Sequence, residues 1–396
     1  MTDNWEMTDN WDPAALAQKL IRCESVTPAE GGALSYLESV LAPIGFQCHR
    51  LPFRETGTPD VDNLYARLGK GGPHLSFAGH SDVVPAGDHA AWTHPPFGAD
   101  IHDGILYGRG AVDMKGAIAC FIAAVSRFLQ SRDGGQGSIS LIITGDEEGP
   151  SINGTVKMLE WMREQGEQMD ASIVGEPSCR TRIGDCIKNG RRGSLNGVVL
   201  VHGKQGHAAY PQQADNPVPK LARMIDRLSS ARLDEGSADF EPSSLQVTVL
   251  DAPNTASNVI PARAAAKFNI RYNDNWQSGQ LEAWVREICE DVAKDMAADF
   301  DLTFSSTGTV FVTRPGPLLD TMSAAIKDVT AMVPELSTDG GTSDARFIHL
   351  HCPVIEFGLV NSTIHQVDEQ VPLADLEQLT AIYQRFLEGY FARPAG

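Results

Sequence analysis

The chain has little positive charge for its length. Its 396 residues include 32 Lys and Arg against 51 Asp and Glu, which gives a formal net charge of −19. A surface of that sign is repelled by phosphate backbones and by anionic lipid, so we expect neither nucleic acid nor a membrane as a partner. An anionic small molecule remains a possible substrate, because a few buried arginines can set the local field.

Long apolar runs and disulfide motifs are also missing. The longest apolar stretch, at 117–125, is too short to cross a bilayer. The first residues show no basic segment followed by an apolar one, the pattern of a secretory signal. The seven cysteines form no Cys-x-x-Cys pair. Together these absences favour reduced thiols and a cytoplasmic location.

The sequence also lacks a Gly-x-Gly-x-x-Gly segment between a predicted strand and a predicted helix, so a dinucleotide-binding enzyme is not favoured. Instead, strand and helix patterns alternate. Predicted strands lie at 64–68, 74–78, 138–144 and 171–174, and predicted helices begin at Pro13, at 33–41, after Asp113 and at 155–165. This alternation is typical of a doubly wound, largely parallel α/β sheet, which binds ligands beyond the carboxyl ends of its strands.

The pattern changes near residue 193. From there to 306, strands and helices follow the order β-α-β-β-α-β, which is that of a ferredoxin-like split βαβ unit. The earlier alternation resumes from Pro317. We therefore predict a discontinuous catalytic domain at 1–192 and 307–396, with a smaller α+β domain at 193–306 inserted into it.

Acidic and imidazole side chains follow the predicted strands. The five that form our candidate metal-ligand set are His80, Asp113, Glu148, Glu176 and His365. Imidazole nitrogen and carboxylate oxygen are ligands of Zn²⁺, and Co²⁺ or Mn²⁺ would accept the same set. Two cations need one shared carboxylate and two further ligands each, which these five residues supply if Asp113 bridges.

Two further acids fit around this set. Glu147 is adjacent in sequence to the candidate ligand Glu148 but is not needed as a ligand, so it is the natural general base for a water between the cations. Asp82, in His-x-Asp, can hold the ring of His80 through its other nitrogen. Each motif alone is weak, since Asp-Glu-Glu is usually a solvated turn and Asp113 alone would be a helix N-cap. Only together do they favour a metal centre.

The chain resembles the zinc aminoacylase and carboxypeptidase family M20 over nearly its whole length. The shared motifs are Gly-His-Ser-Asp at 79–82, Tyr-Gly-Arg-Gly at 107–110, Asp-Met-Lys-Gly at 113–116, Asp-Glu-Glu-Gly at 146–149 and Gly-Glu-Pro at 175–177. The resemblance implies an amide hydrolase with two zinc ions. His80 and Glu176 would complete one site, and Glu148 and His365 the other.

The same resemblance implies that Glu147 is the base and later the proton donor to the leaving amine. It also implies a homodimer formed through the inserted domain. In that dimer His207 would reach into the active site of the partner and hold the oxyanion.

A second group of motifs is similar to one branch of the family. They are Gly-Arg-Arg-Gly-Ser at 190–194, Gln-Gly-His-Ala-Ala-Tyr-Pro at 205–211 and Gly-Gly-Thr-Ser-Asp at 340–344. The substrate implied by this branch is an N-succinylated diamino acid with three carboxylates and one ammonium. Arg191 and Arg271 offer planar forks for carboxylates, although a surface ion pair is the commoner fate of an arginine. The other expected substrate-binding residues are Ser194, Tyr210, Asn258, Gly341, Thr342 and Asn361.

Two alternatives stay open at this point. One is another amide hydrolase of the same family, such as an acetylornithine deacetylase or a peptidase. The other is a metal-binding or dimerisation module without activity, which would need a change at Glu147 or at a ligand, and the sequence shows none. Because the inserted domain supplies expected substrate-binding residues, we also predict that the two domains close on the substrate.

Overall fold

The structure is a computed structural model that describes residues 11–131 and 137–392. The chain forms two compact units. Unit 1 comprises the chain up to Asn189, Thr313–Ser337 and everything from Ser343 on, and unit 2 comprises Gly190–Val312 and Thr338–Thr342. The segment predicted as an insertion, 193–306, lies inside unit 2. That unit also takes its flanking residues and five residues from much later in the chain.

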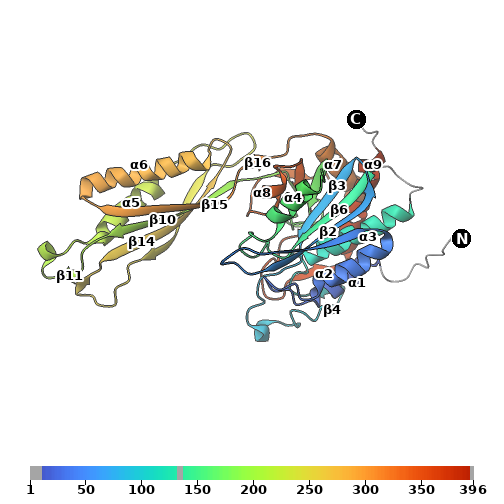
Figure 1. Ribbon diagram of the computed structural model, residues 1–396, viewed down its shortest axis with the longest axis horizontal. Coiled ribbons are helices and arrows are strands. Elements are labelled where there is room, and N and C mark those ends of the chain that lie inside the picture. The colour runs from blue at the N-terminus through green and yellow to red at the C-terminus, as the bar shows by residue number, and fades with distance from the viewer. Residues whose placement is uncertain (1–10, 132–136, 393–396) are drawn as a thin grey trace. The chain divides into compact units, whose positions relative to one another are not determined.

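An eight-stranded mixed sheet forms the centre of unit 1 (Figure 1). Its strands, in spatial order, are β1 (Gln47–Phe53), β2 (Val61–Lys70), β6 (Gly137–Thr144), β3 (His74–His80), β7 (Ala171–Val174), β18 (Val354–Glu356), β8 (Cys186–Lys188) and β17 (Glu335–Ser337). The pairs from β6 to β18 are parallel, as is β8 with β17. The pairs β1/β2, β2/β6 and β18/β8 are antiparallel. The parallel arrangement predicted from the sequence is therefore the middle of the sheet, and its β1 side is antiparallel.

Helices cover both faces of this sheet. On one face Phe77 of β3 stacks on Phe121 of α3 (Lys115–Gln130), with ring centroids 4.2 Å apart. On the other face Tyr65 of β2 lies 5.4 Å from Trp161 of α4 (Thr155–Glu164). Because successive side chains of a strand point to opposite faces, strands covered on both sides are apolar almost throughout. The burial of β6 along nearly all of its length follows from this arrangement.

The remaining helices of unit 1 pack around α3 and the sheet. They are α1 (Pro13–Ile21), α2 (Ala33–Leu41), α7 (Pro317–Thr330), α8 (Ala345–Ile348) and α9 (Leu373–Ala392). The side chain of Asp12 accepts a hydrogen bond from the Ala15 N–H and so caps α1, which begins at Pro13 as predicted. A small sheet of β4 (Ile101–His102), β5 (Ile105–Tyr107) and β19 (Gln370–Pro372) lies beside them.

Unit 2 is built on a four-stranded antiparallel sheet. Its order is β12 (Ser244–Asp251), β14 (Arg263–Tyr272), β10 (Gly193–His202) and β15 (Asp299–Gly308). Two helices, α5 (Pro217–Ser230) and α6 (Ser278–Met296), pack their apolar residues on one face of it, where Leu195, Val199 and Val201 are buried. Alternate residues of β10 are therefore buried and half-buried. Along the chain the elements follow the order β-α-β-β-α-β.

Two short strand pairs flank this sheet. The pair β9 (Gly190–Arg191) with β16 (Phe311–Val312) lies at one end of unit 2, and β11 (Gly206–His207) with β13 (Val259–Ile260) lies at the other (Figure 1). Among the residues that the structure describes, no helix is both long enough and apolar enough to cross a membrane.

Candidate metal centre

The predicted ligands come from the ends of neighbouring strands of unit 1. His80 is the last residue of β3, Glu148 lies in the turn after β6, and Glu176 follows two residues after β7. Asp113 precedes α3, and His365 lies between β18 and β19. Because parallel strands end at the same edge of a sheet, residues distant in sequence meet there.

Asp113 presents its two oxygens to different imidazoles. Its Oδ1 lies 3.0 Å from Nε2 of His80, and its Oδ2 lies 3.1 Å from Nε2 of His365. Glu176 Oε1 lies 3.7 Å from Nε2 of His80, and Glu148 Oε1 lies 2.9 Å from Nε2 of His365. The ligand atoms therefore form two groups, each within 4.8 Å, that share Asp113. A carboxylate that bridges two cations needs this arrangement.

The site holds more negative charge than its own imidazoles can balance. Burial raises the pKa of Glu176 well above its ordinary value, and the nearby carboxylates of Asp113 and Glu147 raise it further. Oε1 of Glu176 is buried and accepts no hydrogen bond. An unsatisfied buried carboxylate oxygen is costly unless a cation or a donor reaches it.

The same excess of carboxylates raises the pKa values of the two imidazoles. Hydrogen bonds with Asp113 and Glu148 raise the pKa of His365 to about 10. Burial lowers the pKa of His80, but the hydrogen bond and charge of Asp113 outweigh it, so this pKa is raised. The two imidazoles hold the pKa of Asp113 below its usual range despite burial. Carboxylate oxygens and imidazole nitrogens in these proportions fit divalent cations, which would replace the protons shared here.

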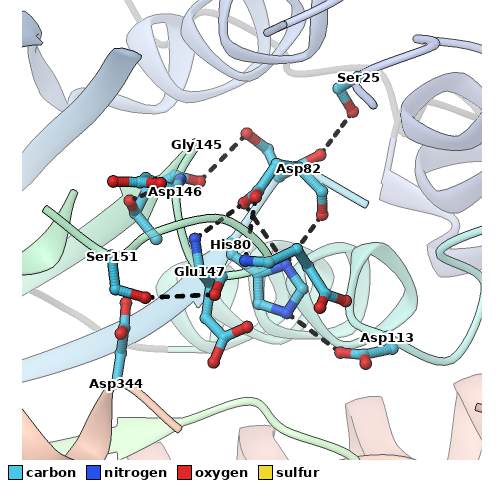
Figure 2. A network of polar contacts seen from close by, with 12 residues as sticks. Ser25, His80, Asp82, Asp113, Gly145, Asp146, Glu147, Ser151 and Asp344 are labelled. Carbon is cyan, nitrogen blue, oxygen red and sulfur yellow. Dashed lines mark hydrogen bonds and ion pairs between the residues drawn. The ribbon is translucent and has the colours of Figure 1, made fainter. Parts of the chain in front are cut away.

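Asp82 contacts both the ring of His80 and the turn after β6. Nδ1 of His80 lies 2.9 Å from the backbone oxygen of Asp82 and 3.7 Å from its carboxylate, so the main-chain carbonyl is the closer partner of the ring. The carboxylate accepts the backbone N–H of Glu147 at 3.3 Å (Figure 2). It also accepts the backbone N–H of Glu148 at 3.1 Å. Asp82 therefore positions the turn after β6, and burial raises its own pKa to about 6.

Glu147 lies beside both ligand groups without belonging to either. It forms a further group with His80 and Glu148. Burial raises the pKa of Glu147 well above its ordinary value, and the carboxylates of Asp344, Glu148 and Asp113 add to this. A carboxylate with a raised pKa next to a cation site is suited to take and return a proton.

Unit 2 brings part of the predicted substrate set together. Ser194 pairs with Arg271 across β10 and β14, and Nη1 of Arg271 lies 3.5 Å from Oγ1 of Thr342, the neighbour of Gly341. Arg191 donates from Nη1 to the backbone oxygen of Asp339 at 2.9 Å. Burial lowers the pKa of Arg271, and the charges of Arg192 and Arg191 lower it further. These arginines are therefore close enough to form one cationic cluster.

The other predicted residues of unit 2 lie elsewhere in it. The rings of His207 and Tyr210 are 5.7 Å apart, and the backbone oxygen of Asn258 accepts the N–H of Ala208. This group adjoins the His202 end of β10, whereas the arginines adjoin the Ser194 end. Eight residues of extended strand span roughly 26 Å. Asn361 is in unit 1, where its N–H donates to the backbone oxygen of Cys179.

A search of family models matches residues 76–389 to peptidase family M20/M25/M40. The chain belongs to this family. Two curated relatives named succinyl-diaminopimelate desuccinylase agree with it over almost their full lengths. The protein of Rhodospirillum centenum is 57% identical, with 96% of this chain and 98% of the relative covered. The protein of Parvibaculum lavamentivorans is 55% identical, with 96% of each covered.

Two solved structures share the fold. The aminopeptidase PepT of Bacillus cereus superposes with a TM-score of 0.80 at 19% identity, covering 98% of this chain and all of that one. A Bacillus subtilis M20 protein described as a dinuclear metal binding peptidase gives a TM-score of 0.72 at 16% identity, covering 97% of this chain and 98% of that one. At these identities the likeness concerns the fold alone.

The structure adds two acids to the surroundings of the centre that the sequence analysis did not single out. Asp344 is buried, accepts a hydrogen bond from Oγ1 of Thr155 at 2.6 Å and raises the pKa of Glu147. Glu369 is buried beneath the Asp113 loop. The only sequence signal for Glu369 is its position four residues after the ligand-type His365, and a lone Glu on a loop is ordinarily a solvated residue.

Proposed function

We propose that this M20-family protein hydrolyses the amide bond of N-succinyl-L,L-2,6-diaminopimelate, releasing succinate and L,L-diaminopimelate for lysine and cell-wall precursor synthesis. The hydrolytic part of the proposal depends on Asp113, whose two oxygens are shared by two ligand groups. The choice of substrate depends on identity to named desuccinylases over nearly the whole chain. In this proposal unit 1 carries the chemistry.

The proposed cofactor is a pair of divalent cations, zinc in the first place, with Co²⁺ or Mn²⁺ able to substitute. The residues that would hold them are His80, Asp113 and Glu176 for one cation, and Asp113, Glu148 and His365 for the other. When bound, such cations polarise a carbonyl oxygen and acidify water. The charge of the cations would then balance the four carboxylates of the centre, which are those of Asp113, Glu147, Glu148 and Glu176.

Glu147 is the proposed proton carrier. Its carboxylate takes a proton from the attacking water while the new C–O bond forms at the amide carbonyl. It then gives that proton to the amide nitrogen as the C–N bond breaks, which leaves a carboxylic acid and a free amine. The second proton of the water then passes from the new carboxyl group to the amine, so the products are a carboxylate and an ammonium group. The raised pKa of Glu147 suits both steps, because a stronger base takes the proton more readily and its acid form persists until the amine departs.

The arginine cluster of unit 2 is the proposed site for substrate carboxylates. Arg191 and Arg271 supply charge and forked geometry, and Ser194, Gly341 and Thr342 supply neutral hydrogen bonds around them. Asn361 is the residue proposed for this purpose in unit 1. A substrate with three carboxylates uses such a cluster, whereas an N-acetylated analogue lacks the succinyl carboxylate. Closure of the two units on the substrate remains part of this proposal.

We further propose a homodimer formed through unit 2. Within one copy, His207, Tyr210 and Asn258 lie at the opposite end of β10 from the arginine cluster, too far to touch the same small substrate. If both groups act on one substrate, one of them must come from a second copy. The edge strand β12 could join two copies, because its backbone has a partner on one side only and Val249 and Leu250 are exposed.

Mixing two inactive variants tests that dimer. We expect His207→Ala to lower kcat more than it raises KM, because its contact is made mainly in the transition state. A mixture of His207→Ala and Glu147→Gln chains should recover activity, since the hybrid dimer has one complete site if His207 acts in the partner. No recovery after verified subunit exchange, or a change in KM alone, would contradict this role.

An assay of the released acid tests the main proposal. The purified protein should release succinate from N-succinyl-L,L-diaminopimelate, lose this activity on chelation and regain it with Zn²⁺ or Co²⁺. Acetate from N-acetylornithine, or amino acids from dipeptides, released at higher kcat/KM would favour another member of the family. A cytoplasmic location also belongs to the proposal, and the seven cysteines are all free thiols in the structure.

A further inference from the structure

One buried carboxylate outside the ligand set holds the loop that carries Asp113. Glu369 has no exposed surface. Its Oε1 accepts the backbone N–H groups of Val112 at 2.8 Å and Asp113 at 3.1 Å. Its Oε2 accepts the N–H of Gly110 at 3.0 Å and Nη1 of Arg109 at 2.7 Å. Four donors from five consecutive residues therefore converge on a single side chain.

The backbone of Glu369 belongs to the same loop as His365, the imidazole that contacts Asp113 Oδ2. Its own carbonyl accepts the N–H of Gly108 at 2.9 Å. The next residue, Gln370, closes the His365 loop, because Thr363 Oγ1 donates to its carbonyl at 3.1 Å and accepts its N–H at 3.2 Å. Glu369 thus lies at the base of the His365 loop, while its carboxylate accepts hydrogen bonds from the Asp113 loop.

Stabilisation of the fold by an ion pair does not account for this arrangement. Arg109 is also buried and lies over the Trp92 ring at 5.2 Å. A buried ion pair is often no more stabilising than apolar residues of the same volume, because both charges lose their hydration. Three of the four hydrogen bonds go to loop backbone instead, which fixes where the loop lies. Burial raises the pKa of Glu369, and the hydrogen bonds from Val112, Gly110 and Arg109 oppose that rise.

We propose that Glu369 is a positioning residue that sets the separation between Asp113 and His365, and through it the affinity of the centre for its second cation. The inference depends on the proposed two-cation centre. Oδ2 of Asp113 and Nε2 of His365 lie 3.1 Å apart, and Glu369 is the side chain that ties their two loops together. Partners of metal ligands commonly change metal affinity or activity by 10- to 100-fold when removed.

The test is a metal titration of the Glu369→Gln apoprotein. An amide has one acceptor oxygen and an NH₂ group, so it must turn a donor towards either the Val112 and Asp113 N–H groups or the Arg109 side. We expect Co²⁺ to bind the first equivalent nearly as in wild type and the second at least about 10-fold more weakly. The visible absorption spectrum of the second Co²⁺ should also change, and kcat should fall more than KM rises.

Two variants control for lost stability. Glu167 forms a half-buried ion pair with Arg67 in unit 1, and Glu167→Gln should lower the unfolding temperature without changing Co²⁺ affinity. Arg109→Lys removes the guanidinium but keeps the three backbone hydrogen bonds of Glu369, so it should destabilise the protein and leave the second equivalent bound. If Glu369→Gln does not fold, Glu369→Asp retains the carboxylate and should show an intermediate affinity.

Each outcome separates this inference from the proposed function. Wild-type protein that binds no pair of cations would overturn the metal centre itself. Wild-type protein that binds two, with either folded Glu369 variant binding two equally well and with an unchanged Co²⁺ spectrum, would overturn the role of Glu369 alone. Equal loss of affinity in the Glu167 control would reduce the effect to stability and would also overturn it.

Discussion

The acidic centre of unit 1 and the arginine cluster of unit 2 are opposite in charge and alike in design. Each holds an excess of one charge in a partly or fully buried place, carboxylates over imidazoles in the centre and arginines in the cluster. In the centre, burial and then the neighbouring carboxylates raise the pKa of Glu176, and in the cluster burial and then the neighbouring arginines lower the pKa of Arg271. Each is therefore a site in need of a counter-ion, cations in unit 1 and carboxylates in unit 2. The net charge of −19 for the whole chain does not show the local charge of either site.

The two regions differ in how they are assembled. The ligands of the centre come from five separate segments that meet at one edge of a sheet, and one residue, Asp113, belongs to both groups. The cluster is built from β9, the facing strands β10 and β14, and a short return of the chain at 338–342. Loss of a shared ligand should abolish function, whereas loss of one arginine should weaken it by degrees.

The largest effect should follow from Asp113→Ala. Both ligand groups lose a member, so we expect neither cation to survive dialysis and turnover to fall by about 10⁴-fold or more. Metal content and succinate release on the same sample measure this. Asp103→Ala, an exposed acid of unit 1, should leave both unchanged. Retention of two cations by Asp113→Ala would show that Asp113 does not bridge.

Glu147→Gln should separate chemistry from metal binding. The amide keeps the size of the side chain but cannot carry the proton, so we expect kcat to fall about 10²- to 10⁴-fold with two cations still bound. Turnover and metal content are again the measurements. If the metal is lost along with activity, Glu147 is a ligand in the group that it forms with His80 and Glu148. Unchanged turnover would exclude it as the base.

Arg271→Ala tests the cationic half of the comparison. Removing a charge-assisted hydrogen bond costs about 1.5–3 kcal/mol, which corresponds to roughly a 10- to 150-fold loss in kcat/KM for the succinylated substrate. An N-acetylated analogue should lose less, because it lacks the succinyl carboxylate. Arg263, exposed on the same strand β14, provides the matched control. An equal loss on both substrates would assign Arg271 to another part of the substrate or to the fold.

The smallest effect concerns the pH dependence of the metal-free protein. The pKa values of Glu147, Glu176, His80 and His365 are all raised in the folded state, that of His365 to about 10. A group whose pKa is raised on folding stabilises the protein below its unfolded pKa and ceases to do so as the pH rises through the folded pKa. The apoprotein should therefore unfold at lower temperature as the pH rises from 6 to 10.

Cations should remove that dependence, because they take the place of the shared protons. Differential scanning calorimetry with and without Zn²⁺ across this pH range measures both curves. An apoprotein that becomes more stable towards pH 10, or a slope that is the same with and without metal, would contradict the account of the acidic centre.

Periodicity in the sequence predicted much of the fold. The helix at 33–41 and the strand at 171–174 match the structure residue for residue, because apolar periodicity decides elements that are buried on a clear face. The strand β1 was not predicted, since Gln47–Phe53 contains Pro52, is mostly exposed or half-buried, and lies at an antiparallel edge. The return of 338–342 to unit 2 has no local signal, because it depends on contacts distant in sequence.

The candidate site was predictable to a similar degree. Ligand-type residues at strand ends could be grouped without knowing any distance, since parallel strands end together. The position of Arg271 beside Ser194 depends on the register of β10 with β14, which the sequence does not display. The roles of Asp82 and Glu369 depend on backbone N–H groups that happen to face them, and no residue pattern encodes those contacts.

Anomalous X-ray scattering at the zinc edge tests the central claim most directly. Crystals of the zinc-loaded protein should show two peaks per chain on either side of Asp113, one beside His80 and Glu176 and the other beside Glu148 and His365. A single peak, or two peaks that do not share Asp113, would contradict the two-cation centre on which the proposed hydrolysis depends.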